Sequence, residues 1–249
     1  MGNLSAVILA AGEGKRMKSD KPKPLSEVLG KPILSWVLDS LKSAGIDNIC
    51  VVTGYKRECI EQYLSTLPFK VETTVQAQRL GTGHAVMTAE AFLKKNGGDV
   101  IILNGDAPFM DCDTIKSSLK QHISDNNSAT VISAKVCDPS GYGRILRDSN
   151  GRLQAIVEHK DCTQQQLMID EINSGGYWFN CADLLSVLGQ IKSNNQAGEY
   201  YLTDAIELLL SSGKNAGAYT AKSSDTVLGA NDPQQLEQLN IIARQRLSR

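Results

Sequence analysis

Apolar runs rich in β-branched residues alternate with amphipathic stretches through the first 106 residues of the chain. Such runs are typical of strands, and the DVIILNGD run is apolar enough to be buried on both faces of a sheet. Because each strand is followed by a stretch with helical spacing, the pattern predicts a parallel sheet with right-handed crossovers. We expect strands at 6–10, 48–54, 70–76 and 99–106, and helices at 33–45, 57–64 and 82–93.

The alternation of strands and helices ends after residue 128, where one strand-like run follows another. The SNG sequence at 149–151 is a hairpin signal between two of these runs. This part of the chain is therefore expected to add mixed or antiparallel strands to the parallel core. A helix is expected from 202 to 210, and the last helix should begin with Asp232 as its N-cap and Pro233 in its first position. The further strands are predicted at 129–136, 144–148, 152–159 and 172–179.

Composition and charge limit the classes of protein to which this chain can belong. The 249 residues show no internal repeat, linker or low-complexity tract, so a single α/β domain is the simplest organisation. With 26 basic and 27 acidic residues the net charge is −1, which argues against a nucleic-acid partner. No apolar run reaches the roughly 18 residues of a membrane span. None of the six cysteines forms a CxxC pair, and we interpret them as reduced residues of a cytoplasmic protein.

A glycine-rich loop, LAAGEGKRM, follows the first strand. Gly12 and Gly14 allow backbone N–H groups to approach an anion without interference from a Cβ atom. Ligands of open α/β sheets bind beyond the carboxyl ends of the strands, so the loop predicts a phosphate-binding site. Neither familiar template fits, because a dinucleotide fingerprint would need glycine in place of Met17 and a Walker loop would need Ser or Thr in place of Arg16.

The same loop gathers positive charge, with five basic residues in the nine positions 15–23 against the single acid Asp20. Lys23 stands between Pro22 and Pro24, which restrict the backbone on both sides of it. A lysine with this little backbone freedom suits a positioned charge, and we favour a contact to phosphate. The alternative is a solvated basic turn.

An acid and an amide are the candidate metal ligands. Asp106 is a lone acid at the carboxyl end of a buried strand, where it offers the hard oxygen that Mg²⁺ prefers; the alternative is a turn aspartate before Pro108. Asn231 offers a neutral oxygen, and its alternative role is in the cap of the last helix. One carboxylate and one amide would leave the ion to complete its shell with phosphate oxygens and water.

The sequence gives no sign of nucleophilic catalysis by a side chain. His84, His122 and His159 fall into no convincing Ser–His–Asp or Cys–His set, and we interpret them as structural or surface residues. Positioned cations that stabilise charge on phosphate groups need no such set.

Several stretches together resemble the sugar-phosphate nucleotidyltransferases. The loop matches the pattern LAAGxGxRM followed by PK, which is the signature of that superfamily. Within it the chain is most similar to the uridylyltransferase (pyrophosphorylase) domain of the bacterial bifunctional N-acetylglucosamine-1-phosphate uridyltransferase / glucosamine-1-phosphate acetyltransferase. The other matching stretches are QAQRLGTGHAV (76–86), NGDAPF (104–109), YGRI (142–145), IVEHKD (156–161), EINSGGYWF (171–179), EYYLTD (199–204) and GANDPQQL (229–236).

This resemblance implies a Rossmann-like, three-layer α/β nucleotidyltransferase fold, with a mostly parallel mixed sheet, helices on both faces and a smaller antiparallel sugar-binding part. It implies that UTP and N-acetylglucosamine 1-phosphate react, with Mg²⁺, to give UDP-N-acetylglucosamine and pyrophosphate. The nucleotide-binding half would cover about residues 1–128, the sugar-binding half about 129–230 and a C-terminal helix about 231–249.

The resemblance also implies roles for individual residues. Arg16 and Lys23 would be catalytic and bind the triphosphate, and Asp106 and Asn231 would ligate the magnesium. Gln76, Gly81 and Thr82 would complete the uracil pocket. The full nucleotide-binding set would be Leu9, Ala10, Ala11, Gly12, Lys23, Gln76, Gly81, Thr82, Asn104, Gly105 and Asp106, and the sugar-binding set Gly143, Glu158, Asn173 and Asn231.

Alternatives stay open at this point. The familiar enzymes continue into a left-handed β-helix of hexapeptide repeats with acetyltransferase activity, which this sequence does not contain, so it is either an excised domain or a single-function enzyme. A second interpretation keeps the fold but assigns another sugar 1-phosphate or another nucleotide. A third is a non-catalytic nucleotide-binding module. The sequence predicts no oligomeric state.

Overall fold

Four parallel strands form one half of the sheet, as the sequence predicts. The computed structural model describes residues 2–17 and 19–248, so Lys18 of the basic loop lies outside the described residues. The central strand β1 is completely buried from Ser5 to Ile8, which explains its apolar composition. It pairs in parallel with both β4 and β6, and β5 extends the sheet beyond β4. The bounds are β1 (Leu4–Leu9), β4 (Asn48–Thr53), β5 (Glu72–Val75) and β6 (Asp99–Asn104).

The other half of the sheet is mixed. Strand β10 (Glu171–Asn180) runs antiparallel to both β6 and β7 (Ala129–Lys135), and β11 (Ala216–Thr220) pairs in parallel with β7 at the edge. The strand order β11-β7-β10-β6-β1-β4-β5 therefore joins the two halves in one sheet. The predicted hairpin is formed by β8 (Arg144–Arg147) and β9 (Leu153–Val157), and β8 also pairs with β10.

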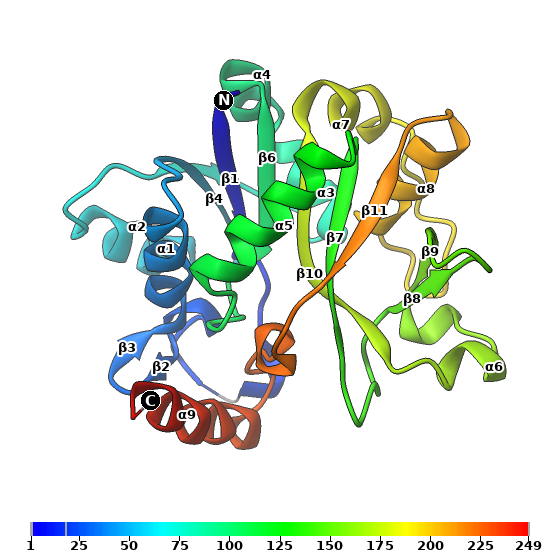
Figure 1. Cartoon of the computed structure of the whole chain (residues 1–249). Coiled ribbons are helices and arrows are strands. Elements are labelled where there is room, and N and C mark those ends of the chain that lie inside the picture. The colour runs from blue at the N-terminus through cyan, green and yellow to red at the C-terminus, as the bar shows by residue number, and fades with distance from the viewer. Residues whose placement is uncertain (1, 18, 249) are drawn as a thin grey trace.

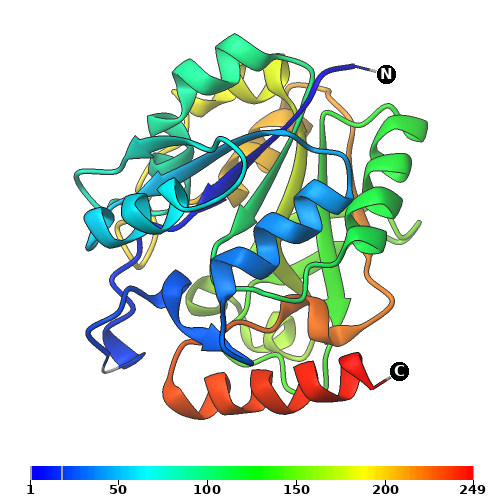
Figure 2. The same ribbon diagram turned by 90° about the vertical axis from the view of Figure 1, so that its left-hand side faces the viewer.

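Helices cover both faces of the sheet (Figures 1 and 2). Successive side chains of a strand point to opposite faces, so Val7 of β1 packs in one hydrophobic cluster while Ala6 and Ile8 pack in the other. The cluster of Val7 is covered by α3 (Thr82–Thr88), α4 (Glu90–Asn96), α7 (Cys181–Leu188) and α8 (Thr203–Ser211). The cluster of Ala6 is covered by α1 (Ile33–Ser43), α2 (Arg57–Ser65) and α5 (Cys112–Ser124).

The last helix, α9 (Pro233–Leu247), lies at the bottom of the molecule beside the short hairpin of β2 and β3 (Figures 1 and 2). Leu239 and Ala243 pack there in a third cluster with Met17 of the basic loop. None of the helices among the described residues is long and apolar enough to cross a membrane. The remaining short elements are η1 (Lys15–Met17), η2 (Lys23–Leu25), β2 (Glu27–Val28), β3 (Lys31–Pro32), η3 (His159–Asp161), α6 (Gln164–Leu167) and η4 (Ser224–Val227).

Some expectations were wrong in detail. The helix expected at 82–93 is two helices, because Ala89 leaves the helical region (φ −92°, ψ 9°) and its N–H bonds to the carbonyl only three residues back. The strand expected at 99–106 ends at Asn104, so Asp106 lies in the turn beyond it. Helices α5 and α7 and strand β11 were not predicted from the sequence; β11 has the sequence AGAYT, in which Gly and Ala are weak strand formers.

The start of α9 is formed as predicted. The Asp232 side chain accepts a hydrogen bond from the backbone N of Gln235 at 2.8 Å, and Pro233 occupies the first helical position. Replacing Asp232 by Ala leaves an N–H of the first turn without that partner, so Asp232→Ala should lower the free energy of unfolding by about 1 kcal/mol. Urea denaturation followed by circular dichroism measures this loss. Asp232→Asn keeps an acceptor and should stay close to wild type; equal stability of the Ala variant would contradict the capping role.

Candidate active site

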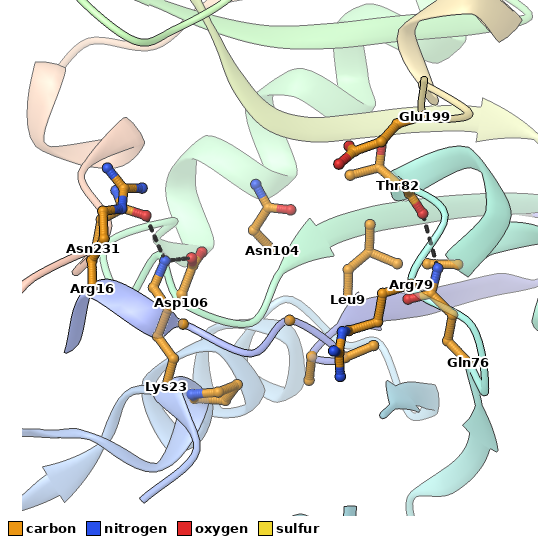
Figure 3. A pocket seen from close by; sticks show the side chains of 17 residues that line it. Leu9, Arg16, Lys23, Gln76, Arg79, Thr82, Asn104, Asp106, Glu199 and Asn231 are labelled. Atoms are coloured by element: carbon orange, nitrogen blue, oxygen red, sulfur yellow. Dashed lines mark hydrogen bonds and ion pairs between the residues drawn. The ribbon is translucent and has the colours of Figure 1, made fainter. Parts of the chain in front are cut away.

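The carboxyl ends of β1, β5 and β6 open into one cavity of about 430 Å³, which we call the first cavity (Figure 3). Loops that leave parallel strands meet at the same edge of a sheet, and this edge is where open α/β sheets bind ligands. Every residue of the predicted nucleotide-binding set except Gly105 lines this cavity, together with Arg16 and Asn231.

Gly105 is buried and does not line the first cavity. Its backbone N–H donates to the carbonyl oxygen of Leu9 at 2.9 Å. A Cβ atom at this position would lie 3.1 Å from the same oxygen, which is tighter than an ordinary contact. The glycine therefore lets the chain after β6 pass close to the end of β1, and its predicted contact with the nucleotide remains a prediction.

The glycines of the basic loop shape the wall of the cavity. Gly12 is exposed, and no atom lies within 4 Å of the place where its Cβ would be, so the backbone is open to a ligand there. Gly14 has φ +61°, a conformation that favours glycine, and its Cβ would lie 3.0 Å from Cβ of Lys23. Gly14 thus allows Lys23 to pack against the loop. Arg16 is exposed on η1 and lines the cavity.

Lys23 connects the two predicted metal ligands. Its ammonium donates to the carboxylate of Asp106 and to Oδ1 of Asn231, the latter at 2.7 Å (Figure 3). The Lys23 side chain is only 12% exposed, so its charge is largely removed from water and needs such partners. The carboxylate and the amide oxygen converge on one cationic centre, which is the property that a metal site requires.

This pair of oxygens fits a magnesium ion better than a transition metal. Both donors are hard oxygens, one charged and one neutral. Among residues 2–17 and 19–248, no group of three or more His, Cys, Asp or Glu side chains could hold a metal ion. An ion held by Asp106 and Asn231 would therefore take its remaining ligands from phosphate oxygens and water, as Mg²⁺ commonly does.

The wall opposite the basic loop is built from two segments that are far apart in the chain. Gln76 is 5% exposed, and its Nε2 donates to the carbonyl oxygen of Gly81 at 2.9 Å. Gly81 has φ +107°, and a Cβ there would lie 2.6 Å from the carbonyl oxygen of Tyr200. The hydroxyl oxygen of Thr82 accepts from the backbone N of Leu202 at 3.0 Å. The EYYLTD stretch (199–204) thus packs tightly against the segment that contains Gly81 and Thr82.

A second cavity, of about 230 Å³, adjoins the first. It is lined by all four predicted sugar-binding residues, Gly143, Glu158, Asn173 and Asn231. A Cβ on Gly143 would lie 3.3 Å from both carboxylate oxygens of Glu158, so the glycine makes room for that acid. The two cavities share Leu9, Thr82, Asn104, Asp106 and Asn231, and they meet where the predicted metal ligands lie.

An irregularity in β10 directs Asn173 into the second cavity. The register with β7 shifts between Asn173 and Gly176, and Gly175 has φ +76°. Oδ1 of Asn173 accepts from the backbone N of Gly175 at 2.9 Å, while its Nδ2 donates to the hydroxyl of Tyr177 at 2.7 Å. A Cβ on Gly175 would collide with the Asn104 side chain, so this glycine lets the strand approach the end of β6. The Asn173 side chain is therefore already held by the protein, and its contact with a sugar remains a prediction.

Glu158 lines the second cavity and has several carboxylates near it. Burial raises its pKa, and the nearby carboxylates of Asp161, Asp204 and Glu199 raise it further. Both causes disfavour the charged form. A carboxyl group with a raised pKa is a good partner for sugar hydroxyls, because it can accept hydrogen bonds and, when protonated, donate one.

Comparison with known proteins places the chain in a family. The family model described as Nucleotidyl transferase matches residues 5–227. The chain belongs to the nucleotidyl transferase family. Its fold is shared with a Bacillus anthracis protein described as a glucose-1-phosphate thymidylyltransferase, with a TM-score of 0.79, 22% identity and coverage of 97% of this chain and 95% of that chain.

Curated relatives in this nucleotidyl transferase family are more similar in sequence. The protein of Acetivibrio thermocellus named Bifunctional protein GlmU is 46% identical over 244 residues, which is 98% of this chain and 52% of the relative. The protein of the same name from Clostridium beijerinckii is 46% identical over 243 residues, again 98% of this chain and 52% of the relative. The chain spans about half the length of the curated relatives it matches.

Several residues of the two cavities were not predicted individually. Arg79 lines the first cavity and forms an ion pair with Glu13 at 3.1 Å, and Glu199 lines the same cavity. Tyr142 and Ser174 line the second. Arg79, Glu199, Tyr142 and Ser174 lie within the matching stretches, so position next to a predicted site residue was the available signal.

Asp204, one of the acids near Glu158, makes the stability of the fold depend on pH. Burial, then the charges of Glu207 and Asp161, raise the pKa of Asp204 from 3.8 to about 6. Between these values the folded protein keeps a proton that the unfolded chain has lost, so the contribution of Asp204 to stability falls as the pH rises from about 4 to 6.

Asp204→Asn removes this ionisation while preserving the shape of the side chain. We expect the melting temperature of the variant to exceed that of wild type by a few degrees at pH 7 and to match it near pH 4. Calorimetric melting at both pH values measures the difference. A gap between variant and wild type that is the same at both pH values would show that Asp204 does not carry the pH dependence.

Proposed function

We propose that this protein transfers a uridylyl group from UTP to N-acetylglucosamine 1-phosphate, forming UDP-N-acetylglucosamine and pyrophosphate. One observation carries the proposal: a basic, glycine-rich cavity and a polar cavity adjoin and share Asp106 and Asn231. This is the arrangement needed to bring a nucleoside triphosphate and a sugar phosphate into contact. The sequence similarity to the proteins named Bifunctional protein GlmU supports the choice of substrates.

The reaction asks for positioned cations rather than for a base. A phosphate oxygen of the sugar phosphate attacks the α-phosphorus of UTP, and the bond from that phosphorus to the bridging oxygen of pyrophosphate breaks. The nucleophile is already an anion, so no proton has to be removed. The barrier comes from repulsion between two polyanions and from charge that develops on the leaving group, and Arg16 and Lys23 would offset both.

Lys23 would have to change partners during the cycle. In the structure its ammonium neutralises Asp106. A triphosphate in the first cavity offers it several anionic oxygens, and a move toward them leaves the oxygens of Asp106 and Asn231 without a cation. Those two residues would hold Mg²⁺, which, when bound, neutralises charge on the phosphate oxygens. Nucleotide and metal would therefore bind together.

The state of the cysteines indicates the compartment in which the protein acts. All six cysteines are free, which suits the reducing cytoplasm, and we infer that the enzyme acts there.

A non-catalytic nucleotide-binding module is less well supported, because Arg16, Lys23 and Asp106 border a single cavity. A different sugar 1-phosphate or nucleotide remains the main competing function. Release of pyrophosphate with a panel of nucleoside triphosphates and sugar 1-phosphates distinguishes the three: silence across the panel favours the binding module.

Lys23 provides the first mutational test. Lys23→Ala removes one transition-state contact, so turnover should fall by about a hundredfold or more. Steady-state kinetics at saturating substrate measures this fall. The control is Lys94→Ala, which removes an exposed lysine that pairs with Glu90 on α4 and lines neither cavity. This variant should retain wild-type turnover. Near-normal turnover of Lys23→Ala would remove this residue from catalysis.

Asp106 provides a test of the metal site. Asp106→Ala removes the only charged ligand of the proposed pair, so the affinity for the divalent ion in the presence of UTP should fall roughly tenfold or more. Titration with Mn²⁺ followed by electron paramagnetic resonance measures binding independently of turnover, and circular dichroism verifies that the fold is intact. The control is Asp47→Asn, which alters an exposed acid directly before β4. An unchanged titration for Asp106→Ala would place the ion elsewhere.

A further inference from the structure

His84, which was interpreted from the sequence as a structural or surface residue, contacts a side chain that lines the first cavity. Nε2 of Gln76 donates to the carbonyl oxygen of Gly81 at 2.9 Å and lies 3.1 Å from Nδ1 of His84. A carbonyl oxygen only accepts hydrogen bonds, so the end of the amide that faces Gly81 is its nitrogen. The surroundings of Gln76 therefore determine which way its amide is turned.

His84 completes this arrangement by accepting a hydrogen bond from the second N–H of the amide. The ring nitrogen Nδ1 accepts in the neutral tautomer that carries its proton on Nε2. With both N–H groups engaged, the carbonyl oxygen Oε1 of Gln76 is the end left for the cavity that the residue lines. Figure 3 shows Gln76 at the wall of this cavity with its bond to Gly81 dashed.

The groups behind Gln76 are themselves held in place. The backbone N of Gln76 donates to the carbonyl oxygen of Thr53 at 2.8 Å, which extends the sheet by one residue beyond β5. His84 is half-buried in the first turn of α3, with its ring 6.3 Å from that of Tyr200. The backbone N of Gly83 donates to the carbonyl oxygen of Tyr200 at 2.7 Å, so the start of α3 is fixed against that segment. A reversed amide would place its oxygen against the oxygen of Gly81.

We propose that His84 sets the selectivity for uracil over cytosine by holding the Gln76 amide with its oxygen toward the base. This inference rests on the proposed function and on the place in the uracil pocket that the family resemblance implies for Gln76. Uracil presents an N3–H donor, whereas cytosine presents an unprotonated N3 at the same place. The Gln76 oxygen would accept a hydrogen bond from N3–H of uracil, but it would face the lone pair on N3 of cytosine. A binding site discriminates strongly against a ligand that leaves a buried polar group unpaired. His84 is a positioning residue that acts through Gln76.

The test compares two nucleotides on each variant. His84→Leu removes the acceptor behind Gln76, so the ratio of kcat/KM for UTP to that for CTP should fall roughly tenfold, the effect of about one hydrogen bond. His84→Asn offers Oδ1 as an acceptor near the position of Nδ1 and should keep most of the wild-type ratio. Both nucleotides are measured on the same preparation, so a loss of active protein cancels in the ratio. An unchanged ratio in His84→Leu overturns the inference.

A double-mutant cycle tests whether His84 acts through Gln76. In a Gln76→Ala background, His84→Leu should leave the UTP/CTP ratio unchanged, because no amide remains to be oriented. A further fall of similar size in that background would mean that His84 acts by another route, and the inference would be wrong. Calorimetric binding of UTP and CTP to the wild type and to His84→Leu gives the same comparison without turnover. Absence of turnover with UTP, combined with the expected change in binding selectivity, would count against the proposed reaction and leave the role of His84 standing.

Discussion

The ammonium of Lys23 joins three segments that are distant in the chain. It contacts Asp106, 83 positions away, and Asn231, 208 positions away. A charge so little exposed to water is tolerated only with partners that replace its hydration, so the basic loop, the turn after β6 and the start of α9 are held to one another. The first cavity exists because these segments meet there.

Glycines that line the two cavities act through the space that they leave. Gly14 makes room for Lys23, Gly81 for the backbone of Tyr200, and Gly175 for the side chain of Asn104. Each lies at positive φ, where a side chain would be strained whatever the space. Substrate recognition in this member of the nucleotidyl transferase family is therefore prepared by close approaches of backbone, and the side chains that carry charge and hydrogen bonds project from a rigid frame.

Sequence reasoning succeeded where a local pattern had a local cause. The period of apolar residues predicted the parallel strands, and Asp232 and Pro233 predicted the start of α9 because capping depends on adjacent residues. The family resemblance named residues that line the two cavities. It could not show that Gly105 is left out of the lining of the first cavity, because that depends on how closely the chain after β6 approaches the end of β1. The contact of His84 with Gln76 was missed for the same reason: eight positions of sequence separate the two, and only the packing of α3 against the sheet brings their atoms together.

Strand β10 links the core of the sheet to the wall of the second cavity. One end of it is bonded to β6 and β7 in the core of the sheet, and the other end pairs with β8, next to Gly143. Residues of this strand border the second cavity, while its partner β6 leads into the first cavity. In the reaction proposed above, backbone and ladder hydrogen bonds would therefore set the separation of the two reactants. No docking of separate bodies would be needed to bring nucleophile and phosphorus to reacting distance.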